Sequence, residues 1–97
     1  MQDNDVILLI DDDDASRNVV RSALSRDGYR LIEASTGEEG LDLYEAQQPA
    51  LVLLDIILPG IDGLETCRRL RARGDVPIMM VSVRDDEVDK VVGLELG

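Results

Sequence analysis

Three aspartates stand directly after apolar runs of the chain, and they are the residues best suited to carry chemistry. Asp11 and Asp12 follow the run 6–10 (VILLI), and Asp55 follows the run 51–54 (LVLL). Carboxylates gathered at one place repel one another, and a hard cation that prefers oxygen ligands, such as Mg²⁺, relieves this repulsion. A carboxylate beside Mg²⁺ can attack phosphorus and form an aspartyl phosphate. The pattern therefore predicts a magnesium site with a candidate phosphoacceptor.

The elements that must position these residues alternate between strands and helices. Strands are expected at residues 6–10, 29–34, 51–54 and 77–83. Helices are expected between Asp14 and Gly28, between Thr36 and Pro49, at 64–73 and at 87–96. Fully apolar strands are typical of a parallel sheet covered on both faces, and short alternating connections require right-handed crossovers. The predicted class is α/β, and residues 1–97 are expected to form one domain.

In an open parallel sheet, ligands bind outside the carboxyl ends of the strands, where the chain order reverses. Asp11, Asp12 and Asp55 fall at such ends, and Ser82 ends the fourth expected strand, where its hydroxyl could donate to a phosphoryl group. The simpler interpretation of an aspartate run is a solvated loop with a helix cap. That interpretation suits the next two aspartates of the run, with Asp14 as the expected N-cap.

Composition excludes several other functions. Asp and Glu number 21 against 10 Lys and Arg, a net charge of −11, so direct binding to nucleic acid or to an anionic membrane is not expected. The chain has no His and one cysteine, Cys67, which argues against zinc hydrolysis, a catalytic triad and an internal disulfide. No stretch reads as a signal peptide or membrane span, so a cytoplasmic protein is expected.

Three segments in this order, VILLIDDDD, LVLLDIILPGIDG and PIMMVSV, resemble the receiver domains of two-component response regulators. The resemblance implies a doubly wound, flavodoxin-like sheet with the strand order 2-1-3-4-5. It also implies that Asp55 is the phosphoacceptor, charged from a phosphohistidine on a sensor histidine kinase. The C-terminal segment looks most like receivers of the winged-helix (OmpR/PhoB-like) subfamily, which regulate transcription through an output domain that this chain does not contain.

The same resemblance assigns roles around the phosphoacceptor. Asp12 and Asp55 would hold Mg²⁺ directly with the backbone carbonyl of Ile57, and Asp11 would act largely through a metal-bound water. Ser82 matches the switch hydroxyl that moves toward the phosphoryl group. A receiver transfers the phosphoryl group only to itself, so the chain is not expected to be an enzyme in the usual sense.

Two departures from the family pattern leave another function open. Val83 follows the switch hydroxyl where the family has a small residue, which narrows access to the site. Receivers also continue past Gly97 with a fifth strand, a lysine at its end and a fifth helix. Without them, the fourth strand would form an apolar sheet edge, so self-association through this edge is expected. The chain would then act as an interaction module that is not phosphorylated.

A phosphohydrolase of the haloacid dehalogenase type is the other alternative. An apolar strand followed by Asp11, Asp12 and Asp13 offers an aspartate nucleophile and an acid two residues later. Such enzymes need a longer chain, and a second aspartate-ending strand stands where a receiver has it. Turnover of a generic phosphate ester would support this alternative.

Overall fold

Within the part of the chain that the structure describes, a four-stranded parallel sheet with helices on both faces forms the fold. The computed structural model describes residues 5–56, 58 and 61–81. The strands are β1 (Val6–Ile10), β2 (Arg30–Ala34), β3 (Leu51–Asp55) and β4 (Ile78–Val81). The helices are α1 (Asp14–Ser25), α2 (Gly37–Gln47) and α3 (Gly63–Arg73). Their alternation along the chain confirms the predicted α/β class.

The strand order in the sheet is β2-β1-β3-β4, and all neighbouring strands run parallel. This order confirms the first four places of the predicted 2-1-3-4-5 arrangement. The chain leaves β1 toward β2 on one side and returns to β3 on the other, so the switch point lies between β1 and β3. Ile10 is level with Leu54 in the register of these two strands. Asp11 and Asp55, one residue further along each strand, therefore leave the sheet at the same height.

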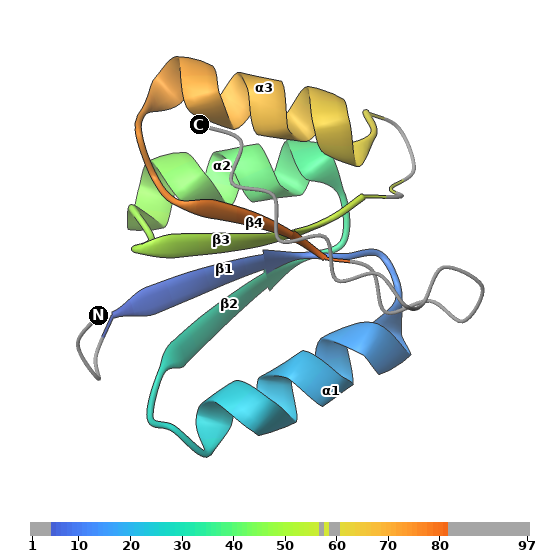
Figure 1. Cartoon of the computed structure of the whole chain (residues 1–97), viewed down its shortest axis with the longest axis vertical. Helices are drawn as coiled ribbons and strands as arrows, with labels where there is room; N and C mark the ends of the chain where they lie inside the picture. Colours follow the sequence, from blue (N-terminus) through green and yellow to red (C-terminus); the bar gives the residue numbers. More distant parts are fainter. Residues whose placement is uncertain (1–4, 57, 59–60, 82–97) are drawn as a thin grey trace.

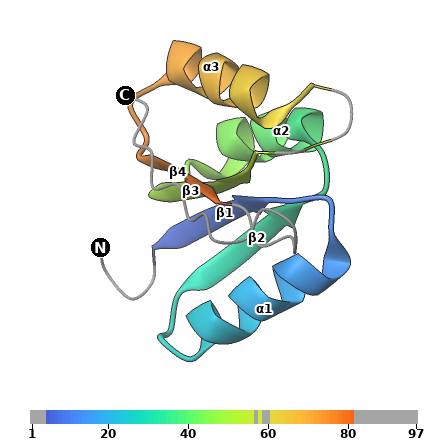
Figure 2. The ribbon, with the colours of Figure 1, turned by 45° about the vertical axis from the view of Figure 1, so that its right-hand side comes forward.

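The helices divide between the two faces of the sheet. Figures 1 and 2 show α2 and α3 together on one face and α1 on the other. The main core lies under α2 and α3, and alternate strand residues supply it, as expected for a period of two. These strand residues are Leu8, Ile10, Ala34, Val52, Leu54, Ile78 and Met80, all at most 1% exposed.

Close packing of α2 on β1 depends on a glycine. A Cβ atom on Gly40 would lie 2.3 Å from the Cδ1 atom of Ile10, so any larger residue would push the helix or the isoleucine away. Thr36 caps the start of α2, because its hydroxyl accepts a hydrogen bond from the Glu39 N–H at 3.0 Å. The helix ends before Pro49, as predicted, with Gln48 at a left-handed φ of 52°.

The start of α1 differs from the prediction by one residue. Asp13, not Asp14, is the N-cap, and its carboxylate accepts from both the N–H and the hydroxyl of Ser16 at 2.8 Å. As N-cap, Asp14 would reach forward to the N–H of Arg17, but that group already donates to the Asp13 carbonyl at 3.0 Å. The expectation placed the cap one residue too late because either aspartate satisfies the cap pattern.

Several expected features lie outside the described residues. These are the end of the fourth strand, with Ser82 and Val83, and the helix expected at 87–96. In the described ranges, no helix has the length and apolar character needed to cross a membrane.

The revised cap can be tested by comparing two alanine variants. Asp13→Ala removes both hydrogen bonds to Ser16 and should lower the free energy of unfolding by about 1 kcal/mol. Asp14→Ala removes an exposed ion pair with Arg17 and should cost roughly 0.5 kcal/mol or less. Urea unfolding followed by circular dichroism measures both. If Asp14→Ala lost more stability than Asp13→Ala, the result would indicate that Asp14 is the N-cap.

Candidate metal and phosphoacceptor site

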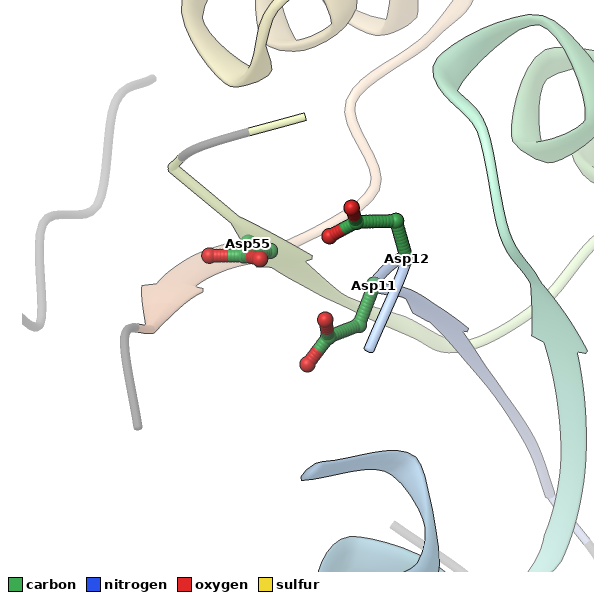
Figure 3. A group of neighbouring side chains, drawn as sticks. All are labelled: Asp11, Asp12 and Asp55. Atoms are coloured by element: carbon green, nitrogen blue, oxygen red, sulfur yellow. The ribbon is translucent and has the colours of Figure 1, made fainter. Parts of the chain in front are cut away.

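The three aspartates singled out by the sequence lie together at the carboxyl ends of β1 and β3. One carboxylate oxygen from each of Asp11, Asp12 and Asp55 lies within 4.8 Å of the other two. Figure 3 shows that Asp11 and Asp12 extend from the end of β1 and Asp55 from the end of β3, next to one another. Asp11 and Asp55 are buried, at 3% and 2% exposure, and Asp12 is exposed. The cluster thus consists of two buried carboxylates and one solvent-exposed carboxylate.

Asp11 is held by backbone and side-chain contacts. Its N–H donates to the Ala34 carbonyl at 3.0 Å, which continues the pairing of β1 with β2 by one residue. One of its carboxylate oxygens accepts from the Asp13 N–H at 3.0 Å, a turn that Asp side chains commonly make. Its own carbonyl accepts from the Arg17 guanidinium at 2.7 Å. The backbone N–H and the backbone carbonyl of Asp11 are therefore both held by hydrogen bonds.

Asp55 is held by the sheet and by the start of α3. It is the last residue of β3 and is level with Val81 of β4. The N–H of Gly63 donates to the carbonyl of Ile56 at 3.2 Å, which ties the first residue of α3 to the backbone just after Asp55. A Cβ atom at Gly63 would lie 2.3 Å from the Asp55 carbonyl oxygen and 2.7 Å from that of Ile56. The helix can approach this backbone only because residue 63 has no side chain.

Asp62 and Gly63 stand at the start of α3, and the structure gives each a defined role. The Asp62 carboxylate caps α3 by accepting from the Glu65 N–H at 2.8 Å. The steric role of Gly63 was missed. An Asp-Gly pair before a helical pattern indicates a turn, but nothing in the sequence tells which backbone the glycine touches.

The charges at the site favour a bound cation. Two ionised carboxylates whose oxygens lie within 4.8 Å of each other repel by at least about 3 kcal/mol at an effective dielectric constant of about 20. Arg17 donates to the backbone carbonyl of Asp11, and its charge is shared by ion pairs with Asp14 and Glu33. Three carboxylates that meet at one point are the hard oxygen donors that Mg²⁺ prefers. The donor set therefore fits this metal.

The other residues assigned to the site lie outside the described residues. They are Ile57, whose carbonyl is the expected metal ligand, Ser82, the expected phosphoryl-binding hydroxyl, and Val83 beside it. The structure thus brings together the three aspartates of the expected set.

Comparison with known proteins defines the class to which this fold and this site belong. A family model described as the response regulator receiver domain matches residues 7–97. Because the match covers nearly the whole sequence, the chain belongs to the response regulator receiver domain family.

Individual relatives agree with this assignment. The transcriptional regulatory protein AfsQ1 of Streptomyces coelicolor is 50% identical over 91 residues, which cover 94% of this chain and 40% of AfsQ1. The N-terminal domain of a response regulator receiver protein from Methanoculleus marisnigri has a TM-score of 0.78 and 38% identity, over 82% of this chain and 68% of that one. CseB of Streptomyces coelicolor and PhoP of Bacillus subtilis are, like AfsQ1, transcriptional regulatory proteins, and the chain spans less than half of the length of each of the three.

A further solved structure bears on the metal. The response regulator TrrA of Thermotoga maritima, described as a complex with Mg²⁺-BeF, has a TM-score of 0.78 and 31% identity. The aligned region covers 90% of this chain and 76% of TrrA.

The close approach at Gly63 can be tested by adding one methyl group. Gly63→Ala should lower the free energy of unfolding by roughly 1–3 kcal/mol, because the new Cβ meets backbone oxygens that cannot rotate away. Leu64→Ala is the control, since Leu64 follows in the same helical turn and is 56% exposed. It should change stability by about 0.5 kcal/mol or less. Urea unfolding measures both variants, and a Gly63→Ala protein as stable as the wild type would contradict the proposed contact.

Proposed function

We propose that this chain is a phosphoacceptor receiver domain in which Asp55 accepts a phosphoryl group from a sensor histidine kinase with the help of Mg²⁺. One observation carries the proposal, namely the meeting of Asp55 with Asp11 and Asp12 at the switch point of the sheet. Membership of the receiver family and the Mg²⁺-BeF complex of TrrA support it. Residues 1–97 are assigned to one receiver domain, which in the full-length protein would switch an output, namely the regulation of transcription.

In the proposed transfer, a carboxylate oxygen of Asp55 attacks the phosphorus of a phosphohistidine. A P–O bond forms while the P–N bond breaks, and the electron pair of that bond remains on the imidazole nitrogen, which takes a proton from solvent. Mg²⁺, when bound, offsets the charge of the carboxylates and of the incoming phosphoryl group. The chain attacks with its own carboxylate and is modified itself, so it is a phosphoacceptor and not an enzyme with an external substrate.

The residues around Asp55 are proposed to have different roles in binding Mg²⁺ and the phosphoryl group. Asp12 and the carbonyl of Ile57 are proposed as direct metal ligands with Asp55, and Asp11 is proposed to act through a water. The hydroxyl of Ser82 would donate to a phosphoryl oxygen, and Val83 would limit access to it. The exposure of Asp12 gives the metal a route to the buried pair.

The charge and composition of the chain limit its partners. With a net charge of −11, this segment is proposed not to contact nucleic acid or membranes directly, and its natural surroundings are the cytoplasm.

A haloacid dehalogenase-type phosphohydrolase would need Asp13 as its acid. In the structure, Asp13 instead accepts two hydrogen bonds from Ser16 as a helix cap.

Phosphorylation by acetyl phosphate tests the proposal. Wild-type protein incubated with acetyl phosphate and MgCl₂ should gain the mass of one phosphoryl group, and chemical trapping of the acyl phosphate should place it on Asp55. Asp55→Asn should abolish the phosphorylation, while its affinity for Mg²⁺ should only be reduced. Asp12→Ala should weaken both the phosphorylation and the binding of Mg²⁺. Asp42→Asn, a change at an exposed aspartate of α2, is the matched control and should behave as the wild type.

The outcomes separate the functions considered. Equal modification of wild type and Asp55→Asn would contradict the phosphoacceptor role. A folded wild-type protein that binds Mg²⁺ without being modified would instead favour an interaction module.

The edge of the sheet favours self-association as a second property. Among the described residues, β4 has β3 as its one strand partner, and Met79 in β4 is 42% exposed between the buried Ile78 and Met80. Apolar edge strands recruit further strands, so we propose that two copies associate through β4.

Sedimentation velocity at increasing concentration tests this association. The wild type should show a concentration-dependent increase in sedimentation coefficient, and Met79→Lys should reduce it by placing a charge on the edge. Leu64→Lys makes a comparable change on the exposed face of α3 and should leave the association unchanged. A strictly monomeric wild-type protein, or an equal effect of both substitutions, would contradict the use of this edge.

A further inference from the structure

Arg17 connects the acidic site to two other parts of the fold. Its Nη1 atom donates to the carbonyl of Asp11 at 2.7 Å, its Nε atom lies 3.2 Å from Glu33 of β2, and its Nη2 atom pairs with Asp14. The side chain is 16% exposed, which is low for an arginine in a helix that is mostly solvent-exposed. One guanidinium thus fixes the β1–α1 loop relative to both α1 and β2.

The anchor on β2 is itself held in place. Arg21 binds Glu33 through two parallel hydrogen bonds of 2.7 Å, and it also donates to Asn18 at 3.1 Å. The hydrogen bond from Arg21, with the charges of Arg21 and Arg17, lowers the pKa of Glu33 below its usual value despite partial burial. Glu33 therefore remains ionised and gives Arg17 a fixed partner.

The contact with the Asp11 carbonyl matters because that carbonyl belongs to the peptide that carries Asp12. The N–H of Asp11 is bonded to Ala34 and its carbonyl to Arg17, so both backbone groups of Asp11 are restrained. This peptide leads directly into the Cα atom of Asp12. The direction in which the Asp12 side chain leaves the backbone therefore depends on the peptide that Arg17 holds.

We infer that Arg17 is a positioning residue for the cation site, holding the Asp11–Asp12 peptide so that the Asp12 carboxylate faces Asp55. The inference rests on the proposed function in that it takes the cation to be Mg²⁺. It goes beyond that function by assigning part of the metal affinity to a residue that touches no metal ligand atom. Groups that orient ligands in this way typically change metal affinity about 10- to 100-fold when removed.

The sign of the effect distinguishes positioning from simple electrostatics. The Arg17 guanidinium donates to the backbone at the acidic site, and its positive charge opposes the binding of a cation there. Removing the charge alone would therefore strengthen Mg²⁺ binding. Removing a positioning contact weakens the binding instead. A residue that only stabilised the fold would shift the unfolding transition and leave the Mg²⁺ affinity of the folded protein unchanged.

The experiment is a titration with MgCl₂ followed through backbone amide NMR signals, with urea unfolding as a parallel measure of stability. Arg17→Met keeps the apolar stem of the side chain and should raise the Kd for Mg²⁺ roughly tenfold. Arg17→Lys keeps the charge but not the planar fork, and it should also weaken binding, by about threefold or more. The amide signals of Asp12 and Asp13 should shift in both metal-free variants.

Arg21→Met is the matched control. It removes the same charge from the same helix and loses the same partner, Glu33, but the structure gives Arg21 no contact with Asp11. It should leave the Kd unchanged or slightly lower. If Arg17→Met does not fold, Arg17→Lys decides alone, and a wild-type Kd in that variant would overturn the inference.

The failures of the two proposals are distinguishable. A wild-type protein that does not bind Mg²⁺ would contradict the metal assignment of the proposed function. If the wild type binds Mg²⁺, equal or tighter binding by Arg17→Met would overturn the positioning role alone. Equal weakening by Arg21→Met would also overturn it, because the effect would then come from the contact between α1 and β2 and not from the Asp11 carbonyl.

Discussion

The parallel pairing of β1 with β3 is the constraint on which the rest of the structure depends. Ile10 lies level with Leu54, so Asp11 and Asp55, the next residue after each of them, lie side by side at the carboxyl edge of the sheet. A slip of one residue would turn the core residues of a strand toward the opposite face and separate the two carboxylates. The apolar side chains of both strands resist such a slip because they fill the core under α2 and α3. The position of the site therefore follows from core packing.

The acidic cluster opposes the stability that this packing provides. Two buried carboxylates and one exposed carboxylate repel one another, and a bound cation would remove much of that repulsion. Anything that binds the folded chain and not the unfolded chain also stabilises the fold by mass action. Cation binding, as proposed, would therefore be linked to folding in this chain. When no cation is bound, the exposure of Asp12 reduces the destabilisation caused by the repulsion, since the Asp12 charge remains hydrated.

Much of this arrangement could be predicted from the sequence, for identifiable reasons. The runs at Val6–Ile10 and 51–54 indicate buried parallel strands, and the rule that such strands share a carboxyl edge brings Asp11 and Asp55 together. The exact cap of α1 could not be predicted, because Asp13 and Asp14 both satisfy the pattern and only the bond to Ser16 decides. The sequence also did not reveal the role of Gly63 beside Asp55, since it depends on a contact between segments that are not adjacent.

Arg17 shows most clearly what a linear pattern leaves out. In the sequence it is one charged residue in an amphipathic helix, and its partners Asp11 and Glu33 stand 6 and 16 positions away. In the helix α1, which the structure describes throughout, Ser16 is the one buried residue, so fewer residues are buried in α1 than in α2 or α3. Apolar contacts are nondirectional, whereas hydrogen bonds to a carbonyl and a carboxylate specify orientation. The polar contacts of Arg17 therefore set how α1 meets the loop that carries Asp12.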